Sequence, residues 1–381
     1  MKIQMFAYRD TANGWYLEPV QLGDLNLLVG VSGVGKTKSL QAMFALNAIA
    51  NGRSANGVEW DIMFEDEGDR NCRWAGKFTN LGLERKVRDY FMRGEDERDV
   101  VLESPRLLSE ALIVDGKDIV KRTAESIVFK GQPTLKLSPS ESAVKLLKEE
   151  ADIAPVYESL SRIVWNKDFR EGKIVDFDRA LEQYPSLTDI QNSKLDIFLK
   201  LSLLSQCEPQ VFTTIKQGFM AIFPYVEDMR VAPIHQDDLP ILIAQFPFVQ
   251  FKEKHIERWI YPWELSNGML KALSVIGDLY LLPPGSVLLI DELENSLGVN
   301  CIDAVGDLLS EKRDLQLILT SHHPYIINTI DMAHWKILTR RGGVVKVSRA
   351  EDFERLSKRS LHDNFTRLLD IEEIIQGVAE T

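Results

Sequence analysis

Residues 25–37 read Leu-Asn-Leu-Leu-Val-Gly-Val-Ser-Gly-Val-Gly-Lys-Thr, and this stretch decides the fold. Its first five residues are apolar on both faces, which is typical of a strand buried between two layers. The rest has the spacing G-x-x-x-x-G-K-[ST], and a helical pattern follows from Lys38 to about Ala50. In such a strand–loop–helix the glycines turn backbone N–H groups towards phosphate oxygens, and the helix N-terminus faces the same anion. The stretch therefore predicts a phosphate-binding loop.

Two side chains of this stretch can bind the nucleotide phosphates and a metal ion. Lys36 supplies a mobile positive charge for the β- and γ-phosphates, and the Thr37 hydroxyl is placed to hold Mg²⁺. A glycine-rich structural turn is the simpler alternative, but the flanking strand and helix are the context that phosphate binding requires. The candidate nucleotide-binding residues of the stretch are Gly30, Ser32, Gly33, Gly35, Lys36, Thr37 and Lys38.

A second element of the expected site lies near the end of the chain. Val287–Ile290 is an apolar strand, and Asp291 and Glu292 follow it directly. The strand brings Asp291 to the C-terminal edge of the sheet, where its carboxylate can hold Mg²⁺ through water. Glu292 is then placed as a general base for an attacking water. A solvated strand end is the alternative interpretation of this pattern.

Two further motifs flank this strand in the sequence. Leu265-Ser-Asn-Gly-Met269 precedes a helical run, so Ser266 can cap that helix and offer its free amides to a γ-phosphate held by another subunit. His322 follows the expected strand Leu315–Thr320 and can hydrogen-bond a γ-phosphate or the attacking water. Taken alone, the first motif is an ordinary helix cap, and the pair His322 and His323 also leaves a metal site open.

Periodicity places most of the other elements. Lys2–Arg9 alternates like a strand, and residues 58–80 are expected to form a hairpin with its turn at Glu65–Asp69. From about Ser138 to Tyr280 helical patterns dominate. Strands that alternate with helices predict a largely parallel α/β sheet, interrupted here by a helical insertion. The remaining expected elements are a charged helix or loop at Glu84–Asp99, a helix at Asn300–Leu309 and a hairpin of Trp335–Thr339 and Val344–Val347.

The composition argues against several classes of protein. The 381 residues include 45 Lys and Arg against 57 Asp and Glu, a net charge of −12, which disfavours binding of nucleic acid by bulk charge. No apolar run approaches the roughly 18 residues of a membrane span and no signal-like segment begins the chain, so we expect a cytoplasmic protein. The 3 cysteines are too scattered for a disulfide framework. The basic runs that leave a nucleic-acid partner open are Arg85–Arg93, Lys336–Arg341 and Arg355–Arg359.

Taken in order, the four motifs resemble those of ABC-type ATPases. Their long separation is unlike transporter subunits and resembles the soluble RecF/SMC-like branch, which includes AAA-labelled ATPases of the OLD, Septu and retron-linked antiphage systems. Leu289–Ser296 is similar to the IDEPEN run of that branch, and Ser321–Pro324 to its THSP run. Within the motifs, Gly30–Thr37 resembles Walker A, Leu265–Met269 the signature, Val287–Glu292 Walker B and His322 the switch histidine.

The resemblance implies an ABC-type P-loop ATPase head with a mixed α/β sheet, interrupted by a large helical lobe. The expected ATP-binding lobe comprises residues 1–137 and 270–381, with a β-hairpin subdomain near 58–80. Residues 138–269 are expected to form the helical lobe, which carries the signature at its end. The resemblance also implies ATP and Mg²⁺ as cofactors and a head-to-tail homodimer with ATP between its subunits. Ser266 and Gly268 of one copy would close on the γ-phosphate held by the other.

The chain departs from the family pattern at several positions. Asn267-Gly268-Met269 stands where the signature usually has Gly-Gly-Gln, so only Ser266 and Gly268 carry over. Leu293 replaces the proline of the IDEPEN run, and Gly298 stands where the family has a histidine. Outside the motifs, the resemblance implies Gln132 as the Q-loop ligand of Mg²⁺ and Arg9 as a contact on the adenine side.

The implied activity is hydrolysis of ATP, with Lys36, Glu292 and His322 as catalytic residues and with Thr37 and Asp291 on the metal. The expected role is that of a sensor or regulatory subunit in a bacterial antiphage defence complex, whose separately encoded effector is a nuclease or toxin. Two alternatives stay open. One is a RecF-like DNA-repair ATPase that binds DNA, and the other is an ATP-dependent binding scaffold with little turnover.

Overall fold

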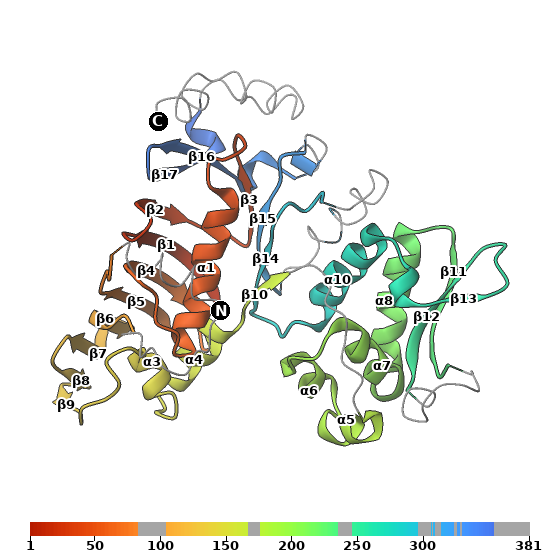
Figure 1. Ribbon diagram of the computed structural model, residues 1–381, viewed down its shortest axis with the longest axis horizontal. Coiled ribbons are helices and arrows are strands. Elements are labelled where there is room, and N and C mark those ends of the chain that lie inside the picture. Colours follow the sequence, from red (N-terminus) through yellow and green to blue (C-terminus); the bar gives the residue numbers. More distant parts are fainter. Residues whose placement is uncertain are drawn as a thin grey trace, which may run out of the picture. The chain divides into compact units, whose positions relative to one another are not determined.

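The computed structural model describes residues 1–82, 104–166, 176–234, 246–295, 306, 308, 314–323, 326–327 and 330–353. Contacts divide the chain into two compact units, which we name the sheet unit and the helical unit (Figure 1). The sheet unit comprises Met1–Trp165, Gly285–Asp291 and Gln316–Thr381. The helical unit comprises Asn166–Pro284 and Glu292–Leu315.

Among the described residues, one sheet of fourteen strands dominates the sheet unit. Its strand order is β10-β14-β15-β3-β16-β17-β2-β1-β4-β5-β6-β7-β8-β9. The strands are β1 (Lys2–Asp10), β2 (Trp15–Gln21), β3 (Leu25–Val29), β4 (Val58–Glu65), β5 (Asn71–Phe78), β6 (Leu107–Val114), β7 (Lys117–Thr123), β8 (Ile127–Phe129), β9 (Gln132–Pro133), β10 (Ile163–Asn166), β14 (Val287–Ile290), β15 (Gln316–Thr320), β16 (Trp335–Arg341) and β17 (Val344–Arg349).

Four neighbouring strands of this sheet, β14, β15, β3 and β16, run parallel. Ile290 pairs with Leu319 and Leu319 pairs with Leu27, while Ile337 pairs with Val29. Every residue of β14 and β15 is buried, as expected for strands covered on both faces. Because parallel strands end at the same edge of a sheet, the residues that follow β14, β15 and β3 meet there.

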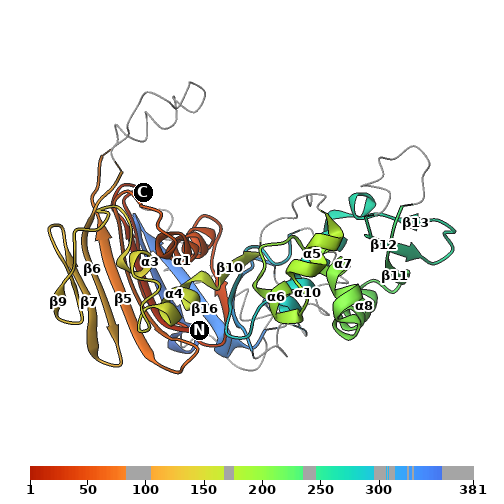
Figure 2. The same ribbon diagram turned by 90° about the horizontal axis from the view of Figure 1, so that it is seen from below.

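Eight further strands, in the order β2-β1-β4-β5-β6-β7-β8-β9, form an antiparallel meander, and β17 links it to β16. The hairpin predicted near residues 58–80 is confirmed, because β4 and β5 pair antiparallel along their length. In its turn the Asp66 carboxylate accepts hydrogen bonds from the backbone N–H groups of Gly68 (2.9 Å) and Arg70 (3.1 Å). The meander is longer than a single hairpin, since β6 to β9 continue it (Figure 2).

Three helices of the sheet unit lie against one face of the sheet (Figure 2), namely α1 (Lys36–Ala50), α3 (Ala143–Leu146) and α4 (Ala154–Ser161). The amide of Asn47, on α1, donates to the carbonyl oxygens of Ser161 (2.8 Å) and Ile163 (3.1 Å). The Glu110 carboxylate of β6, which is 2% exposed, accepts a hydrogen bond from the backbone N–H of Ala143 at 2.8 Å. These bonds attach residues 138–165 to the sheet unit, whereas the sequence assigned them to the helical lobe.

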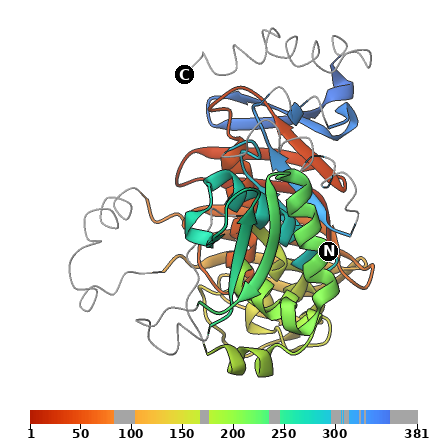
Figure 3. The same ribbon diagram turned by 90° about the vertical axis from the view of Figure 1, so that its right-hand side faces the viewer.

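The helical unit differs from the sequence-based expectation in its middle. Three antiparallel strands, Val226–Ala232, Phe248–Glu253 and Trp259–Ile260, lie there, so the prediction of helix at these residues is wrong (Figure 3). Val226, Met229, Val249 and Phe251 are buried, and apolar residues of this kind favour a sheet face when they pack on helices. The described elements are α5 (Phe177–Gln183), α6 (Leu187–Asn192), α7 (Ile197–Cys207), α8 (Pro209–Ile222), β11 (Val226–Ala232), β12 (Phe248–Glu253), β13 (Trp259–Ile260), η1 (Pro262–Glu264) and α10 (Asn267–Leu281).

Two expected elements fall wholly or mainly outside the described residues, namely Glu84–Asp99 and Asn300–Leu309. The hairpin expected at Trp335–Val347 is present as β16 and β17. Within the described ranges, no helix combines the length and the hydropathy that a membrane crossing demands.

Candidate nucleotide-binding site

Gly30–Gly35 connects β3 to α1, which begins with Lys36 and Thr37, as the sequence predicts. Gly33 and Gly35 adopt left-handed φ angles of 79° and 112°, a conformation that favours glycine. A Cβ atom on Gly30 would lie only 2.9 Å from the carbonyl oxygen of Leu338, so this position has no room for a side chain. Backbone conformation and space therefore both require the glycines of this loop.

The Lys36 side chain crosses the inside of the loop. Its Nζ donates to the carbonyl oxygens of Gly30 (2.8 Å) and Val31 (3.2 Å), and the residue is only 9% exposed. Ser32 and Gly33, at the tip of the loop, are exposed. An ammonium group held by carbonyl oxygens beside an open loop tip is placed to meet a phosphate with a charge-assisted hydrogen bond.

The two predicted Mg²⁺ ligands of the motifs lie together. The Thr37 hydroxyl donates to Oδ1 of Asp291 at 3.1 Å, although the two residues are 254 positions apart in the chain. A hydroxyl and a carboxylate beside a phosphate loop fit the way in which Mg²⁺ is bound, with few protein oxygens and the phosphates of a nucleotide. Within the described ranges, no group of three or more His, Cys, Asp and Glu side chains could hold a metal.

A second side chain donates to this carboxylate, and the sequence analysis assigned it no role. Thr320 is the last residue of β15 and is fully buried, and its hydroxyl donates to Oδ1 of Asp291 at 2.6 Å. Thr320 could have been predicted from its position, because it ends a strand that was expected to lie beside Val287–Ile290. Thr320 orients the carboxylate of Asp291 towards Thr37.

Replacing Thr320 by valine is expected to raise the Mg²⁺ concentration that gives half-maximal ATP turnover by about tenfold or more. A hydrogen bond to a charged group contributes about 1.5–3 kcal/mol, and valine removes the donor to Asp291. The measurement is ATPase activity titrated with Mg²⁺. Thr320→Ser keeps the hydroxyl and should stay near the wild type, so an equal response of both variants would contradict this role.

The residues that follow Asp291 and β15 are the two other predicted catalytic groups. Glu292 has a φ of 43°, a left-handed conformation that residues with side chains rarely adopt, and its carbonyl accepts from the backbone N–H of Asn295 at 2.7 Å. Such conformations cost about 1–3 kcal/mol and cluster at functional sites. His322 is exposed and lies two residues beyond β15, after the buried Ser321.

The expected signature occupies the N-terminus of α10, in the helical unit. The Ser266 hydroxyl accepts a hydrogen bond from the backbone N–H of Met269 at 3.2 Å, so the predicted helix cap is confirmed. Ser266 and Asn267 are exposed, while Met269 is 3% exposed. The methionine that replaces the glutamine of the family pattern is thus a core residue of the helical unit.

Gln132 is not brought together with the predicted metal ligands. It lies on β9, at the opposite end of the fourteen-strand order from β14 and β15, and it is exposed. Neighbouring strands are about 4.8 Å apart, so β9 is tens of ångströms from β3 along the sheet. The prediction of Gln132 as a ligand of the same ion as Thr37 and Asp291 is therefore wrong.

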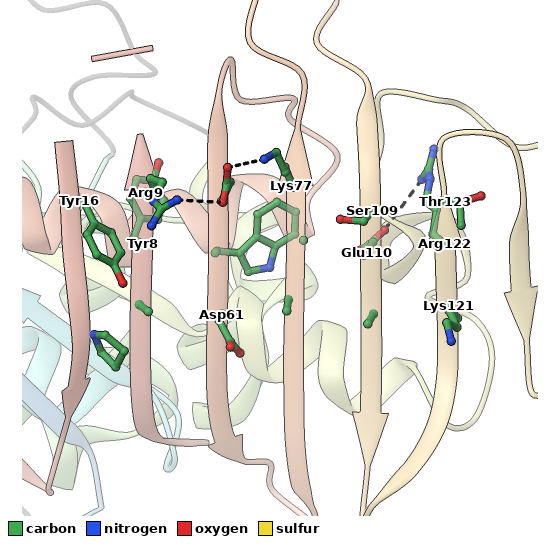
Figure 4. A pocket seen from close by; sticks show the side chains of 17 residues that line it. Tyr8, Arg9, Tyr16, Asp61, Lys77, Ser109, Glu110, Lys121, Arg122 and Thr123 are labelled. Atoms are coloured by element: carbon green, nitrogen blue, oxygen red, sulfur yellow. Dashed lines mark ion pairs between the residues drawn. The ribbon is translucent and has the colours of Figure 1, made fainter. Parts of the chain in front are cut away.

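Arg9 lies in a groove on the exposed face of the meander (Figure 4). Its guanidinium carbon is 4.6 Å from the centroid of the Tyr16 ring, and its NH1 is 4.0 Å from Oε2 of Glu59. Lys77 forms an ion pair with the same Glu59 at 2.7 Å. The groove holds about 660 Å³ and carries these paired charges, as a solvated sheet face does. These contacts do not join Arg9 to the Gly30–Thr37 loop.

Trp15, rather than Arg9, lies beside the start of α1. Lys38 places its Nζ 4.8 Å from the centroid of the Trp15 ring, and a Cβ on Gly35 would lie 3.5 Å from Nε1 of Trp15. This Nε1 is buried and has no hydrogen-bond partner among the described residues. No sequence signal indicated Trp15, because its neighbours Gly35 and Lys38 come from a segment twenty residues later in the chain.

The one basic run in the described part of the chain is partly buried. Of Lys336–Arg341, which belongs to β16, Lys336 is only 8% exposed. Burial lowers the pKa of Lys336, as expected for an ammonium group removed from water. Arg85–Arg93 and Arg355–Arg359 lie outside the described residues.

Comparison with known sequences finds a family model that matches part of the chain. A model described as "AAA domain, putative AbiEii toxin, Type IV TA system" matches residues 166–328. This segment contains Ser266, Asp291 and His322 but not the Gly30–Thr37 loop. No curated protein sequence matches the chain significantly.

Comparison with solved structures gives the fold. The chain is similar to an SMC head bound to the C-winged helix domain of ScpA, with 14% identity and a TM-score of 0.50 over 91% of this chain and 97% of that one. An SMC head from Thermotoga maritima matches with 13% identity and a TM-score of 0.45 over 92% of this chain and 99% of that one. An Smc head bound to the C-terminal domain of ScpA, derived from Pyrococcus furiosus, matches with 13% identity and a TM-score of 0.49 over 97% and 99%. The first of these structures shows that the chain has the fold of an SMC head, and residues 166–328 are similar to the AAA domain family.

Proposed function

We propose that the chain binds ATP with Mg²⁺ at the Gly30–Thr37 loop and hydrolyses it. The observation that carries this proposal is the hydrogen bond of 3.1 Å between Thr37 and Asp291, beside a loop that contains Lys36. The loop amides and Lys36 bind the phosphates, and Thr37 and Asp291 hold the ion. Bound Mg²⁺ would neutralise charge on the β- and γ-phosphate oxygens.

Two residues at the same edge of the sheet supply the rest of the chemistry in this proposal. Glu292, directly after Asp291, accepts a proton from the attacking water as general base. His322 hydrogen-bonds the γ-phosphate or the water and orients it. Catalysis then consists of positioning and electrostatic stabilisation, which is what phosphoryl transfer to water requires.

The proposed active form is a head-to-tail pair of identical chains with ATP between them. Support comes from the exposed N-terminus of the fifteen-residue helix α10, which Ser266 caps and which contains Gly268. The free amides and the dipole of such a helix end favour an anion. In the pair, this helix end would close on the γ-phosphate held by the other copy, so ATP binding and hydrolysis would control association.

The proposed biological role is regulation, in the cytoplasm, of a separate effector protein in a bacterial antiphage defence complex. The matching family is described by reference to a toxin of type IV toxin–antitoxin systems, and the SMC head of similar fold is bound to a domain of ScpA. These descriptions apply to the family and to the SMC head, not to this chain. They support a role in which this chain acts on a partner protein, a nuclease or toxin.

The test of the proposed pair is the molecular mass of Glu292→Gln protein in solution, measured by light scattering without nucleotide, with Mg²⁺–ADP and with Mg²⁺–ATP. We expect a dimer with Mg²⁺–ATP only. Ser266→Arg in the same background should bind ATP and stay monomeric. A Glu292→Gln protein that binds ATP and remains a monomer would contradict the pair. Co-purification of a co-expressed genomic neighbour, dependent on ATP, would identify the effector.

A further inference from the structure

The C-terminal end of β16 lies against the tip of the phosphate loop. Trp335 and Ile337 of β16 pair in parallel with Leu27 and Val29 of β3, so the residues after Ile337 run beside the loop that leaves β3. Here Arg340 donates from its NH1 to the carbonyl oxygen of Gly33 at 3.2 Å. A residue more than 300 positions away in the chain is thus bonded to the tip of the loop.

A second hydrogen bond fixes the direction of this side chain. Nε of Arg340 donates at 2.7 Å to the carbonyl oxygen of Gly342, which lies in the turn that follows β16. A guanidinium is planar and has five N–H donors, of which these two bonds use two. In the described part of the chain no ion pair joins Arg340 to a carboxylate. Arg340 is therefore a cation that two hydrogen bonds hold in place beside the loop, and its other three N–H donors are not used by these bonds.

The charges around the loop form a set that suits a polyanion. Lys36 lies inside the loop, Lys38 is held over the Trp15 ring at the start of α1, and Arg340 lies at the tip. Guanidinium groups bind phosphate with two parallel charge-assisted bonds, and a side chain already held in place loses little freedom when it does so.

We propose that Arg340 is a nucleotide-binding residue, whose guanidinium contacts the phosphate chain of a nucleoside di- or triphosphate held in the Gly30–Thr37 loop. This inference rests on the proposed ATP binding and adds to it a cation from outside all four motifs. Since Gly33 belongs to the part of the loop that surrounds the phosphates, ADP and ATP are both expected to depend on Arg340.

The test is the dissociation constant for Mg²⁺–ATP and Mg²⁺–ADP, measured by calorimetry on the full chain. Arg340→Ala is expected to weaken both nucleotides about tenfold or more, as loss of a charge-assisted bond does. Arg341→Ala, the neighbouring exposed arginine, is the matched control and should bind within about twofold of the wild type. Thermal melting without nucleotide checks that each variant is folded.

A second substitution separates a contact with phosphate from a structural tie between the turn and the loop. Arg340→Lys keeps the charge but loses the planar fork whose Nε and NH1 donate to Gly342 and Gly33. If Arg340 attracts phosphate, the lysine variant should regain part of the affinity, and the loss in Arg340→Ala should shrink at high salt. Equal losses in the lysine and alanine variants, independent of salt, would overturn the proposal.

A further variant, Lys36→Ala, distinguishes failure of the Arg340 proposal from failure of the proposed ATP binding. Lys36→Ala is expected to abolish measurable ATP binding. If the wild type and Lys36→Ala bind ATP equally poorly, then the proposed ATP site is wrong. If Lys36→Ala loses binding while Arg340→Ala binds like the wild type, the ATP site stands and the role of Arg340 is refuted.

Discussion

Replacing Glu292 by glutamine is expected to lower ATP turnover by about 10²–10⁴-fold while leaving ATP affinity nearly unchanged. A positioned general base contributes a factor of this size, and glutamine has the shape of glutamate without the ability to accept the proton. The left-handed backbone at Glu292, with φ 43°, is retained by a substitution of equal size. The measurement is phosphate release at saturating Mg²⁺–ATP, together with the dissociation constant for ATP.

The matched control for this substitution is Glu294→Gln. Glu294 lies two residues further on, in the turn that is closed by the hydrogen bond from Asn295 to Glu292. The Glu294→Gln substitution removes one negative charge from the same segment. It therefore measures how much the charge of the segment alone affects ATP turnover. A Glu292→Gln protein that turns over ATP at the wild-type rate would refute the assigned base. A parallel loss in both variants would point to the charge of the segment rather than to proton transfer.

Replacing Asp278 by asparagine is expected to stabilise the helical unit, and the gain should grow as the pH rises from about 4 to about 7. Burial raises the pKa of Asp278 to about 6 from 3.8. The hydrogen bond from the Asn166 amide to its Oδ2, at 2.6 Å, and the charges of Lys200 and Lys271 act in the opposite direction but are outweighed. The ionised form is therefore less favourable in the folded protein than in the unfolded chain.

The sign follows from this raised pKa. When a carboxyl group has a higher pKa in the folded protein than in the unfolded chain, the free energy of unfolding falls as the pH rises between these two pKa values. Above both pKa values the loss is constant. A difference of about two pH units corresponds to about 3 kcal/mol at pH 7. Asparagine cannot ionise, and its side-chain oxygen can still accept the hydrogen bond from Asn166. The variant should thus match the wild type near pH 4 and exceed it at pH 7.

Hydrogen exchange of peptides from α7 and α10 at several pH values measures this local stability directly. Asp118→Asn, a substitution of an exposed aspartate in the sheet unit, is the control and should not alter exchange in these helices. A difference between Asp278→Asn and the wild type that is the same at pH 4 and pH 7 would show that the ionised carboxylate carries no penalty.

The strands and the loop of the site could be predicted because their signals are local. The apolar runs Leu25–Val29 and Val287–Ile290 read as buried strands by themselves, and both have these bounds in the structure. The glycine spacing of Gly30–Thr37 and the cap at Ser266 depend on residues within one turn of each other. By contrast, the short strands of residues 226–260 carry only a few apolar residues each, which periodicity cannot distinguish from helix.

Contacts between residues that are distant in the chain could not be predicted. Such contacts explain why Gln132 was wrongly predicted as a metal ligand and why Thr320 and Arg340 were missed. The family resemblance implies Gln132 as a metal ligand, but the order of strands in the sheet places it at the far edge. Arg340 belongs to no motif, and Thr320 was given no role of its own. Thr320 reaches Asp291 because β15 pairs with β14, and Arg340 reaches Gly33 because β16 pairs with β3.

The sequence by itself determined that this chain has a phosphate-binding loop, the strand that ends in Asp291 and Glu292, and the capped helix end at Ser266. These features depend on residue types and short spacings, which act through local backbone geometry and hydrogen bonding. Only the tertiary structure decided which side chains surround the loop. Thr320, Trp15 and Arg340 reach it through the pairing of strands far apart in the chain. That pairing is set by the burial of whole strand faces and therefore has no signature in any single segment.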